Sequence, residues 1–166
     1  MDKPEKIVTP EQAFAQMAQL CARKECCVWD VRQKLKRMSL SEEAVGAIID
    51  RLTKGRFIDE ARYSRNFIHD KLVFNKWGKM KIVLSLRQKR IPTEVIDAAF
   101  EEFSERQLSE SLPQLLEAKR KTVKGNSPYE INGKLIRYAL GRGYPMNEVL
   151  RCMREMNINE LPDETE

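Results

Sequence analysis

The sequence contains a single histidine, His69, and this scarcity limits the catalytic sites that it could form. A Ser/His/Asp or Cys/His site would have to use that one imidazole, which lies in a helical stretch between Ile68 and Asp70. No phosphate-binding loop and no Gly-x-Gly-x-x-Gly turn occurs, and Gly141-Arg142-Gly143 ends a helical pattern instead of following a strand. We therefore expect neither enzymatic activity nor a cofactor.

Cysteines in metal-binding patterns and long apolar runs are also absent. The four cysteines lack the paired Cys-x-x-Cys spacing of structural zinc sites, so we expect no bound metal and reduced thiols, some of them in the core. They are Cys21, Cys26, Cys27 and Cys152. No apolar run is long enough to cross a bilayer and no signal peptide is recognisable, which predicts a cytoplasmic protein with no membrane partner.

Strand-like alternation is missing too, because apolar residues recur at a period near 3.6 and not at a period of two. The same pattern appears three times, around anchors at Leu40, Ile91 and Tyr144 that lie 51 and 53 residues apart. Apolar residues follow each anchor at offsets of five, nine and twelve, which traces one face of a helix. These residues are Val45, Ile49, Leu52, Ile96, Phe100, Phe103, Val149, Met153 and Met156.

The three repeats predict an all-α fold, in which tandem three-helix repeats form an elongated, curved array. We expect the repeats at residues 9–56, 57–103 and 104–157. A polar tail precedes them at residues 1–8, and a disordered acidic tail follows at residues 158–166. A unit of about 50 residues buries little surface alone, so we expect neighbouring repeats to share interfaces.

Local signals predict where helices begin and end. Thr9-Pro10-Glu11-Gln12 is typical of a capping box that opens the first helix. Gly55 is expected to end a helix in the left-handed conformation. Asp59 is expected to cap the next helix, so that Asp59-Glu60-Ala61-Arg62 is a capped first turn and not an acidic site. Pro113 should kink or break the first helix of the third repeat.

Trp77 has two interpretations. It lies in a turn between Lys76 and Lys79, where its ring could stack on a base or on a partner surface. Alternatively, it closes the turn of the second repeat onto the core. The sequence leaves both interpretations open.

Acidic residues are missing from a long central stretch. Residues 71–93 contain seven basic residues and no acid, and residues 118–142 contain seven basic residues and one acid, within a net charge of +5. This segregation predicts a basic band that attracts a polyanion or an acidic protein groove, with a merely solvated surface as the alternative. The candidate contact residues are Lys76, Lys79, Lys81, Arg87, Lys89, Lys119, Arg120, Lys134 and Arg137.

Several motifs occur in an order that is similar to one bacterial family. In the second repeat, Gly55-Arg56-Phe57-Ile58-Asp59-Glu60-Ala61-Arg62-Tyr63-Ser64 is followed by Gly78 and then by Leu86-Arg87-Gln88-Lys89. The third repeat adds Arg142-Gly143-Tyr144. At this spacing the chain resembles the RecX family, the regulatory proteins that act on the RecA recombinase. The resemblance covers about residues 13–156.

The resemblance implies a small modulator that lies in the helical groove of a RecA filament on single-stranded DNA. It would hinder strand exchange, ATP turnover and LexA cleavage without catalysing a reaction. Its partners would be the RecA nucleoprotein filament and, more weakly and with salt sensitivity, single- and double-stranded DNA; it would act as a monomer. Arg90 and Ser39 stand where the family usually has glycine, so we expect the helix before Arg90 to end without a left-handed glycine cap.

Two other classes of protein remain open. A direct nucleic-acid-binding helical repeat protein would use three-helix units as helix-turn-helix modules, and it would bind DNA with sequence preference and without RecA. A helical scaffold for another acidic protein would bind that partner in the absence of nucleic acid.

Overall fold

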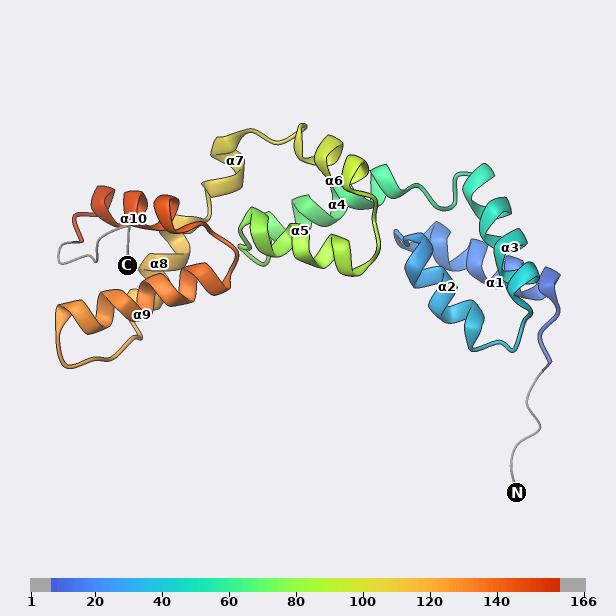
Figure 1. The fold of residues 1–166 in the computed structure, drawn as a ribbon, viewed down its shortest axis with the longest axis horizontal. Helices are drawn as coiled ribbons and strands as arrows, with labels where there is room; N and C mark the ends of the chain where they lie inside the picture. Colours follow the sequence, from blue (N-terminus) through green and yellow to red (C-terminus); the bar gives the residue numbers. More distant parts are fainter. Residues whose placement is uncertain (1–6, 159–166) are drawn as a thin grey trace, which may run out of the picture.

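The computed structural model describes residues 7–158, and these residues form ten α-helices and no strand. The helices are α1 (Pro10–Arg23), α2 (Val28–Lys36), α3 (Glu42–Lys54), α4 (Glu60–Val73), α5 (Lys79–Gln88), α6 (Thr93–Phe100), α7 (Glu105–Ser109), α8 (Leu112–Arg120), α9 (Pro128–Gly141) and α10 (Met146–Glu155). They lie in three groups, α1–α3, α4–α6 and α7–α10, that follow one another along an arch (Figure 1). The predicted all-helical repeat array is therefore confirmed. None of these helices has both the length and the apolar character needed to span a bilayer.

The helix starts follow the predicted capping signals. At α1 the amide of Gln12 donates to Thr9 Oγ1 at 3.2 Å, and the amide of Thr9 donates to Gln12 Oε1 at 3.1 Å, which completes the capping box. At α4 the carboxylate of Asp59 accepts from the amide of Arg62 at 3.0 Å. That hydrogen bond holds the pKa of Asp59 below its usual value, because it favours the ionised form.

The third group has four helices because its first helix is broken. α7 ends at Ser109, and α8 begins at Leu112 with Pro113 in its first turn, where a missing amide costs least. The break predicted at Pro113 is confirmed. It also frees Ser111, whose hydroxyl donates to the carbonyl of Leu72 at 3.1 Å and so ties the third group to the second.

Left-handed residues end several helices, but at positions that the sequence only partly indicates. Gly55 has a φ of −80°, so the prediction of a left-handed turn at Gly55 is wrong, and the next residue, Arg56, has a φ of 59°. Arg90 has a φ of 57° after α5, and Ser39 has a φ of 55° after α2. The chain therefore keeps the left-handed turn without glycine, which costs up to about 1 kcal/mol at each residue.

Each group of helices encloses a hydrophobic core of its own. The predicted stripe is buried at offsets five and nine in all three groups, at Val45, Ile49, Ile96, Phe100, Val149 and Met153. At offset twelve only Leu52 is buried. Phe103 and Met156 lie beyond the ends of α6 and α10 and are half-buried. The predicted stripe is too long there because α6 and α10 stop before its last position.

Three further residues differ from the sequence pattern. Ala61 and Leu140 are apolar residues within helices, but both are exposed. Ile158, expected in a disordered tail, is buried against the third core, and its amide donates to the carbonyl of Met153 at 2.9 Å. The rest of that tail, and most of the tail before Thr9, lie outside the described residues.

The second and third groups meet through a backbone contact between α9 and α5. The amide of Gly78 donates to the carbonyl of Arg142 at 2.7 Å, and the amide of Met80 donates to the carbonyl of Gly143 at 3.1 Å. The end of α9 therefore supplies acceptors to the start of α5, and the two helices run end to end (Figure 1). A Cβ on Gly78 would overlap the carbonyl of Gly143, so the contact requires glycine.

Side chains close this joint around the two glycines. The hydroxyl of Tyr144, which is 1% exposed, donates to the carbonyl of Lys76 at 3.0 Å. Gly143 has a φ of 100°, and a Cβ there would lie 2.5 Å from the Cβ of Lys81. The left-handed conformation and the close approach both exclude a larger residue at Gly143.

We predict that Gly78→Ala weakens the joint and lowers the free energy of unfolding by at least about 2 kcal/mol, because two buried backbone hydrogen bonds of about 1 kcal/mol each must lengthen. Gly46→Ala is the matched control. Gly46 lies inside α3 with no atom within 4 Å of the added Cβ, so alanine there should stabilise the protein by about 0.5–1 kcal/mol. Urea denaturation of both variants measures the two effects. If both substitutions changed the free energy of unfolding equally and in the same direction, Gly78 would not be required for the backbone contact.

Candidate nucleic-acid interface

The first and second groups of helices meet at the position equivalent to the α9–α5 joint. Cys27 precedes α2 as Gly78 precedes α5, and Arg90 stands in the place of Gly143. The separations are the same 51 and 53 residues that relate the repeat anchors. Because Cys27 and Arg90 both carry side chains, the end of α5 cannot approach α2 as closely as α9 approaches α5.

Side chains replace the backbone hydrogen bonds at this joint between α5 and α2. Lys89 caps the C-terminus of α5. Its Nζ lies 2.6 Å from Oδ1 of Asp30, which is in the first turn of α2. The same ammonium lies 4.7 Å from the centre of the Trp29 ring, a distance typical of a cation–π contact. Trp29 itself packs against the core of the second group. Lys89, a predicted contact residue, therefore stabilises the joint between repeats.

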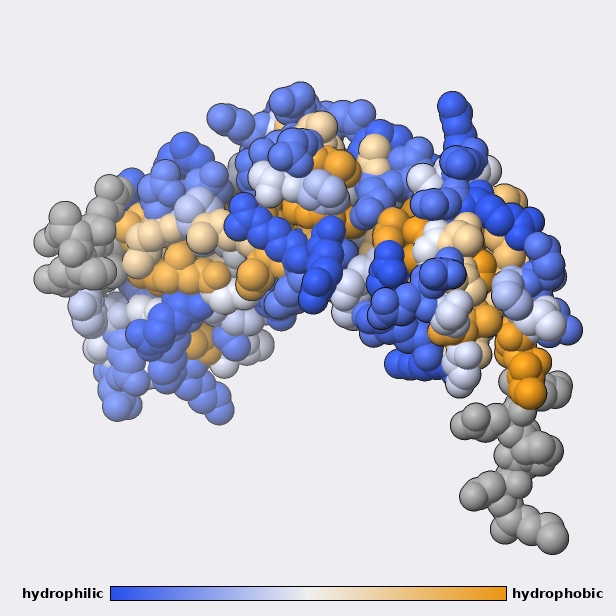
Figure 2. All heavy atoms as spheres, turned by 45° about the vertical axis from the view of Figure 1, so that its right-hand side comes forward, coloured by the Kyte–Doolittle hydropathy of each residue, from blue (hydrophilic) through white to orange (hydrophobic). Residues whose placement is uncertain are grey.

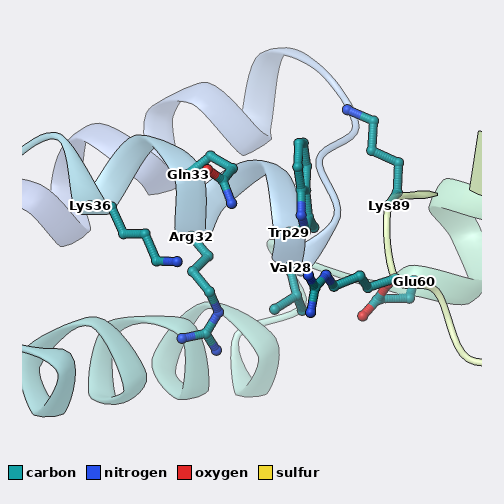
Figure 3. Close-up of a pocket in the computed structure, with 8 residues that line it drawn as sticks. Val28, Trp29, Arg32, Gln33, Lys36, Glu60 and Lys89 are labelled. Carbon is teal, nitrogen blue, oxygen red and sulfur yellow. The ribbon is translucent and has the colours of Figure 1, made fainter. Parts of the chain in front are cut away.

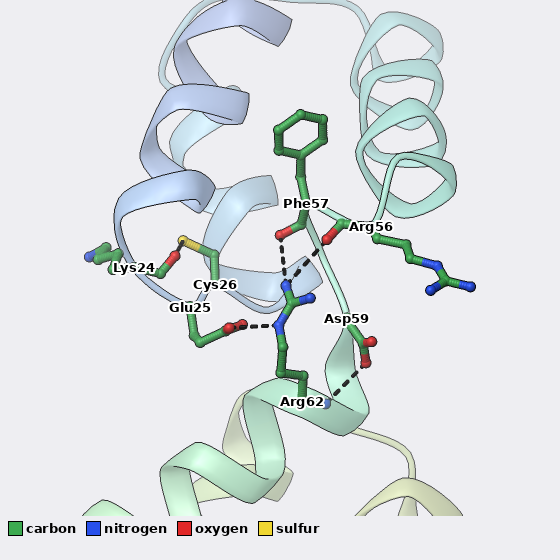
Figure 4. A network of polar contacts seen from close by, with 7 residues as sticks. All are labelled: Lys24, Glu25, Cys26, Arg56, Phe57, Asp59 and Arg62. Carbon is green, nitrogen blue, oxygen red and sulfur yellow. Dashed lines mark hydrogen bonds and ion pairs between the residues drawn. The ribbon is translucent and has the colours of Figure 1, made fainter.

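A second set of polar contacts strengthens the same joint from α4. The guanidinium of Arg62 donates from Nε to Glu25 Oε1 at 2.6 Å, and from a terminal nitrogen to the carbonyls of Arg56 and Phe57 at 3.3 and 3.5 Å (Figure 4). The hydrogen bond to Glu25 raises the pKa of Arg62. Arg62, which the sequence indicates only as part of a capped turn, thus links the α1–α2 loop to the start of α4.

A cavity of about 220 Å³ opens where α5 ends beside α2 (Figure 3). Half of its lining residues are basic, and one is aromatic: Val28, Trp29, Arg32, Gln33, Lys36, Glu60, Lys89 and Arg90. Figure 3 shows Arg32 and Lys36 extending from α2 on the same side, with Trp29 beside Val28. We call this space the junction cavity.

Glu60 is the one acid among the residues that line the junction cavity. Its Oε2 atom is buried and has no hydrogen-bond partner among the described residues. Burial, and then the nearby carboxylate of Asp30, raise the pKa of Glu60. Burial also raises the pKa of the neighbouring Cys27 thiol to about 12, so this thiol stays protonated at neutral pH.

Lys76 and Lys81, both predicted contact residues, lie at the α9–α5 joint. Lys76 Nζ donates to Gln114 Oε1 at 3.1 Å. Lys81 Nζ lies 4.5 Å from the centre of the Trp77 ring, and Lys71 Nζ lies 4.7 Å from the same centre. Trp77 is half-buried against the second core, which agrees with the interpretation that it closes the turn.

Two predicted contact residues of α5 are open to solvent. Lys79 is exposed, with its Nζ 5.0 Å from the centre of the Phe100 ring. Arg87 is exposed near the other end of the helix. These side chains can meet a partner without breaking a short internal contact.

The four predicted residues of the third group divide in the same way. Lys134 Nζ donates to the carbonyl at residue 124 at 2.6 Å, and Lys119 Nζ lies 4.7 Å from the centre of the Tyr138 ring. Arg120 and Arg137 are exposed. The structure therefore distributes the nine predicted residues over two joints and several helix surfaces and does not gather them at one point.

Sequence reasoning missed the residues that line the junction cavity apart from Lys89. Arg32 and Lys36 are one helical turn apart on α2, a spacing that places both on one face, but nothing in the sequence pairs that face with Arg90. The signal that could have found these residues is the equivalence of Cys27 and Gly78 in the repeat pattern. It places the start of α2 at the joint between the first and second groups.

The remaining side chains considered for metal or nucleophilic chemistry in residues 7–158 are the cysteines and His69. No three metal-ligating side chains gather there, and the four cysteines are free and buried. His69 is exposed, with Nδ1 3.4 Å from Asp70 Oδ1. Most of the face shown in Figure 2 is hydrophilic, with hydrophobic atoms gathered in patches over each group of helices.

Fold and surface together define the class: an all-α tandem-repeat protein with basic side chains at and around the joints between its repeats. A family model described as RecX, second three-helix domain, matches residues 59–99. The chain belongs to the RecX family, and its relatives are named regulatory proteins. The family predicted from the motifs is confirmed.

Relatives from three organisms, each named regulatory protein RecX, show the extent of the match. The protein of Clostridium beijerinckii is 32% identical over 136 residues, which cover 81% of this chain and 63% of the relative. That of Clostridium acetobutylicum is 31% identical over 135 residues, covering 76% and 60%. That of Prosthecochloris aestuarii is 27% identical over 133 residues, covering 78% and 83%. The chain thus spans about three fifths of the length of the two clostridial relatives.

Two solved structures share the fold. A crystal structure of regulatory protein RecX superposes with a TM-score of 0.79 at 20% identity, over 87% of this chain and 71% of that one. A crystal structure of RecX from Lactobacillus salivarius superposes with a TM-score of 0.78 at 16% identity, over 90% of this chain and 97% of that one. At these identities the likeness supports the fold.

We predict that Glu60→Gln stabilises the protein at about pH 7 but not at about pH 4. The folded state binds the Glu60 proton more tightly than the unfolded state, because its pKa is raised on folding. Wild-type stability is therefore lost as pH rises from the unfolded pKa through the folded one, and glutamine removes that loss. Urea titrations of both proteins at the two pH values measure the difference. An equal effect of the substitution at both pH values would contradict a buried Glu60 carboxylate with a raised pKa.

Proposed function

We propose that this protein binds the RecA filament on single-stranded DNA and inhibits its recombinase, ATPase and coprotease activities without catalysing a reaction itself. Membership of the RecX family, whose matched members are named regulatory proteins, supports the proposal. The observation that carries it is the presence of exposed basic side chains along the array, at Lys36, Arg87, Arg120 and Arg137. A long surface of this kind suits a repeating, polyanionic partner.

The physical basis is multivalency. We propose that the repeats at residues 9–56, 57–103 and 104–157 each contribute part of the contact, so that one chain bridges successive RecA protomers and nearby phosphates. Each contact of a surface cation with a phosphate is weak, but linked contacts act at high effective concentration. Inhibition then follows from holding the filament in one arrangement. Monomeric action in the cytoplasm is part of the same proposal.

Binding of DNA without RecA is the second candidate function, and the junction cavity favours it. This cavity brings an aromatic ring and several cations together, a combination by which proteins bind single-stranded nucleic acid. The two candidates predict different behaviour: a filament regulator changes RecA activity, whereas a simple DNA-binding protein competes with RecA for DNA.

We predict that reversing Arg87, Arg120 and Arg137 to Glu weakens inhibition of RecA ATPase by at least about tenfold, because each lost attraction to phosphate becomes a repulsion. Exposed charges contribute little to stability, so the melting temperature should stay within a few degrees. The measurement is ATPase activity of the cognate RecA on single-stranded DNA with increasing protein.

The matched control reverses three exposed basic residues of the first group, Arg23, Arg37 and Lys54, which changes the net charge equally. This control should lose clearly less inhibition than the variant of the second and third groups. If both variants inhibit like the wild type, basic side chains do not carry the contact. If the wild type leaves ATPase activity unchanged at stoichiometric amounts, the proposed function is wrong.

We also predict that filament binding weakens steeply as salt rises. Neutralised phosphates release counterions, so about three phosphate contacts should cost roughly tenfold or more in affinity over a fourfold increase in salt. Fluorescence anisotropy of labelled filaments measures the affinity at each salt concentration. A flat response would mean that the basic side chains remain solvated in the complex.

A further inference from the structure

The junction cavity carries an excess of positive charge that the folded chain does not neutralise. Arg32, Lys36 and Arg90 line it and have no ion-pair partner among the described residues. Lys89 is paired with Asp30, and Glu60 is the one acid in the lining. Three cations around a concave space with one carboxylate form a site for an anion.

The cavity results from the way in which the joint is built. At the α9–α5 joint, Gly78 and Gly143 let the two helix ends touch, and no side chain separates them. At the α5–α2 joint, Cys27 and Arg90 take those places, and the indole of Trp29 enters the joint. The space is a consequence of the fold and is held open by packed side chains.

The size and lining indicate what the cavity accepts. Its volume of about 220 Å³ is below the range of about 300–1,000 Å³ that is typical of sites for drug-sized ligands. It therefore suits a small anionic group together with part of a flat ring. Trp29 and Val28 supply an apolar wall beside the cations, and an indole is a good surface for a nucleobase.

We propose that the junction cavity is a binding site for single-stranded DNA, in which Arg32, Lys36 and Arg90 hold a backbone phosphate and Trp29 contacts the neighbouring base. The inference rests on the proposed function, because it assigns the DNA of the filament to one place on the chain. A phosphate matches the fork of Arg32, which can donate two hydrogen bonds to it. An acidic protein segment could form ion pairs with the same cations, but its carboxylates would not stack on the indole of Trp29.

Binding is tested by the fluorescence of Trp29 in a full-length Trp77→Phe background, where Trp29 is the only tryptophan. The probe is an oligothymidylate of about 12 nucleotides, compared with an abasic oligomer of the same length and with a polyglutamate peptide. We expect the oligothymidylate to quench Trp29 and to bind at least about threefold more tightly than the abasic oligomer, because only the former can stack.

Arg32→Gln and Arg37→Gln form a matched pair. Arg32 lies in the middle of α2 and Arg37 caps its C-terminus, so each variant removes one arginine from the same helix, but only Arg32 lines the cavity. We expect Arg32→Gln to lower oligothymidylate affinity by at least about fivefold and Arg37→Gln to change it by less than about twofold. Circular dichroism confirms that both variants fold.

Glu60→Gln gives a change in the opposite direction. It removes the one negative charge from the lining and keeps the size of the side chain, so oligothymidylate should bind about two- to fivefold more tightly at neutral pH. A general loss of basic surface cannot produce this gain. A variant that binds more weakly than the wild type would contradict phosphate binding in the cavity.

The outcomes separate this inference from the proposed function. If Arg32→Gln binds oligothymidylate as the wild type does, or if the abasic oligomer binds as tightly as oligothymidylate, the cavity is not a site for a phosphate and its base. If polyglutamate alone quenches Trp29, the cavity takes an acidic protein and the inference is overturned. In each case, wild-type inhibition of RecA ATPase decides the proposed function independently.

Discussion

The arrangement of the array depends on the direct backbone contact between Gly78 and Gly143. Helix ends leave unpaired amides and carbonyls, and here the carbonyls after α9 accept hydrogen bonds from the amides that begin α5. Each helix supplies the partners that the other lacks, and their dipoles align head to tail. The absence of both side chains makes this possible, so two small residues determine how the third group of helices sits on the second.

The α5–α2 joint, between the first and second groups, is held by side chains and not by backbone hydrogen bonds. Where Cys27 and Arg90 prevent close approach, Lys89 spans the gap to Asp30 and packs on Trp29. An ion pair with side chains 34% and 23% exposed is weaker and more solvent-dependent than paired backbone groups. This joint therefore relies on side-chain contacts where the α9–α5 joint uses backbone hydrogen bonds, and the junction cavity lies beside it. Burial of Cys27 in the second core, next to the first core, keeps the two groups in contact nonetheless.

Much of this fold was predictable, because its signals are local. The 3.6 period behind Leu40 and its equivalents identified the repeats, and Pro113 identified the broken helix, since both act within a few residues. The left-handed residue at Arg56 was missed because glycine is only a preference for that conformation. The cavity was missed because Arg32 and Arg90 meet only after two repeats dock, and no periodicity within one repeat contains that information.

The basic residues of the array are of two kinds. Some, such as Lys76 and Lys134, are held by internal hydrogen bonds and contribute potential more than contact. Others, such as Arg87 and Arg137, are exposed and can form new pairs at little cost to the fold. An excess of cations at the joints raises the local positive potential in the free protein. A polyanion that bridges a joint relieves this repulsion, so binding and the rigidity of the array should reinforce each other.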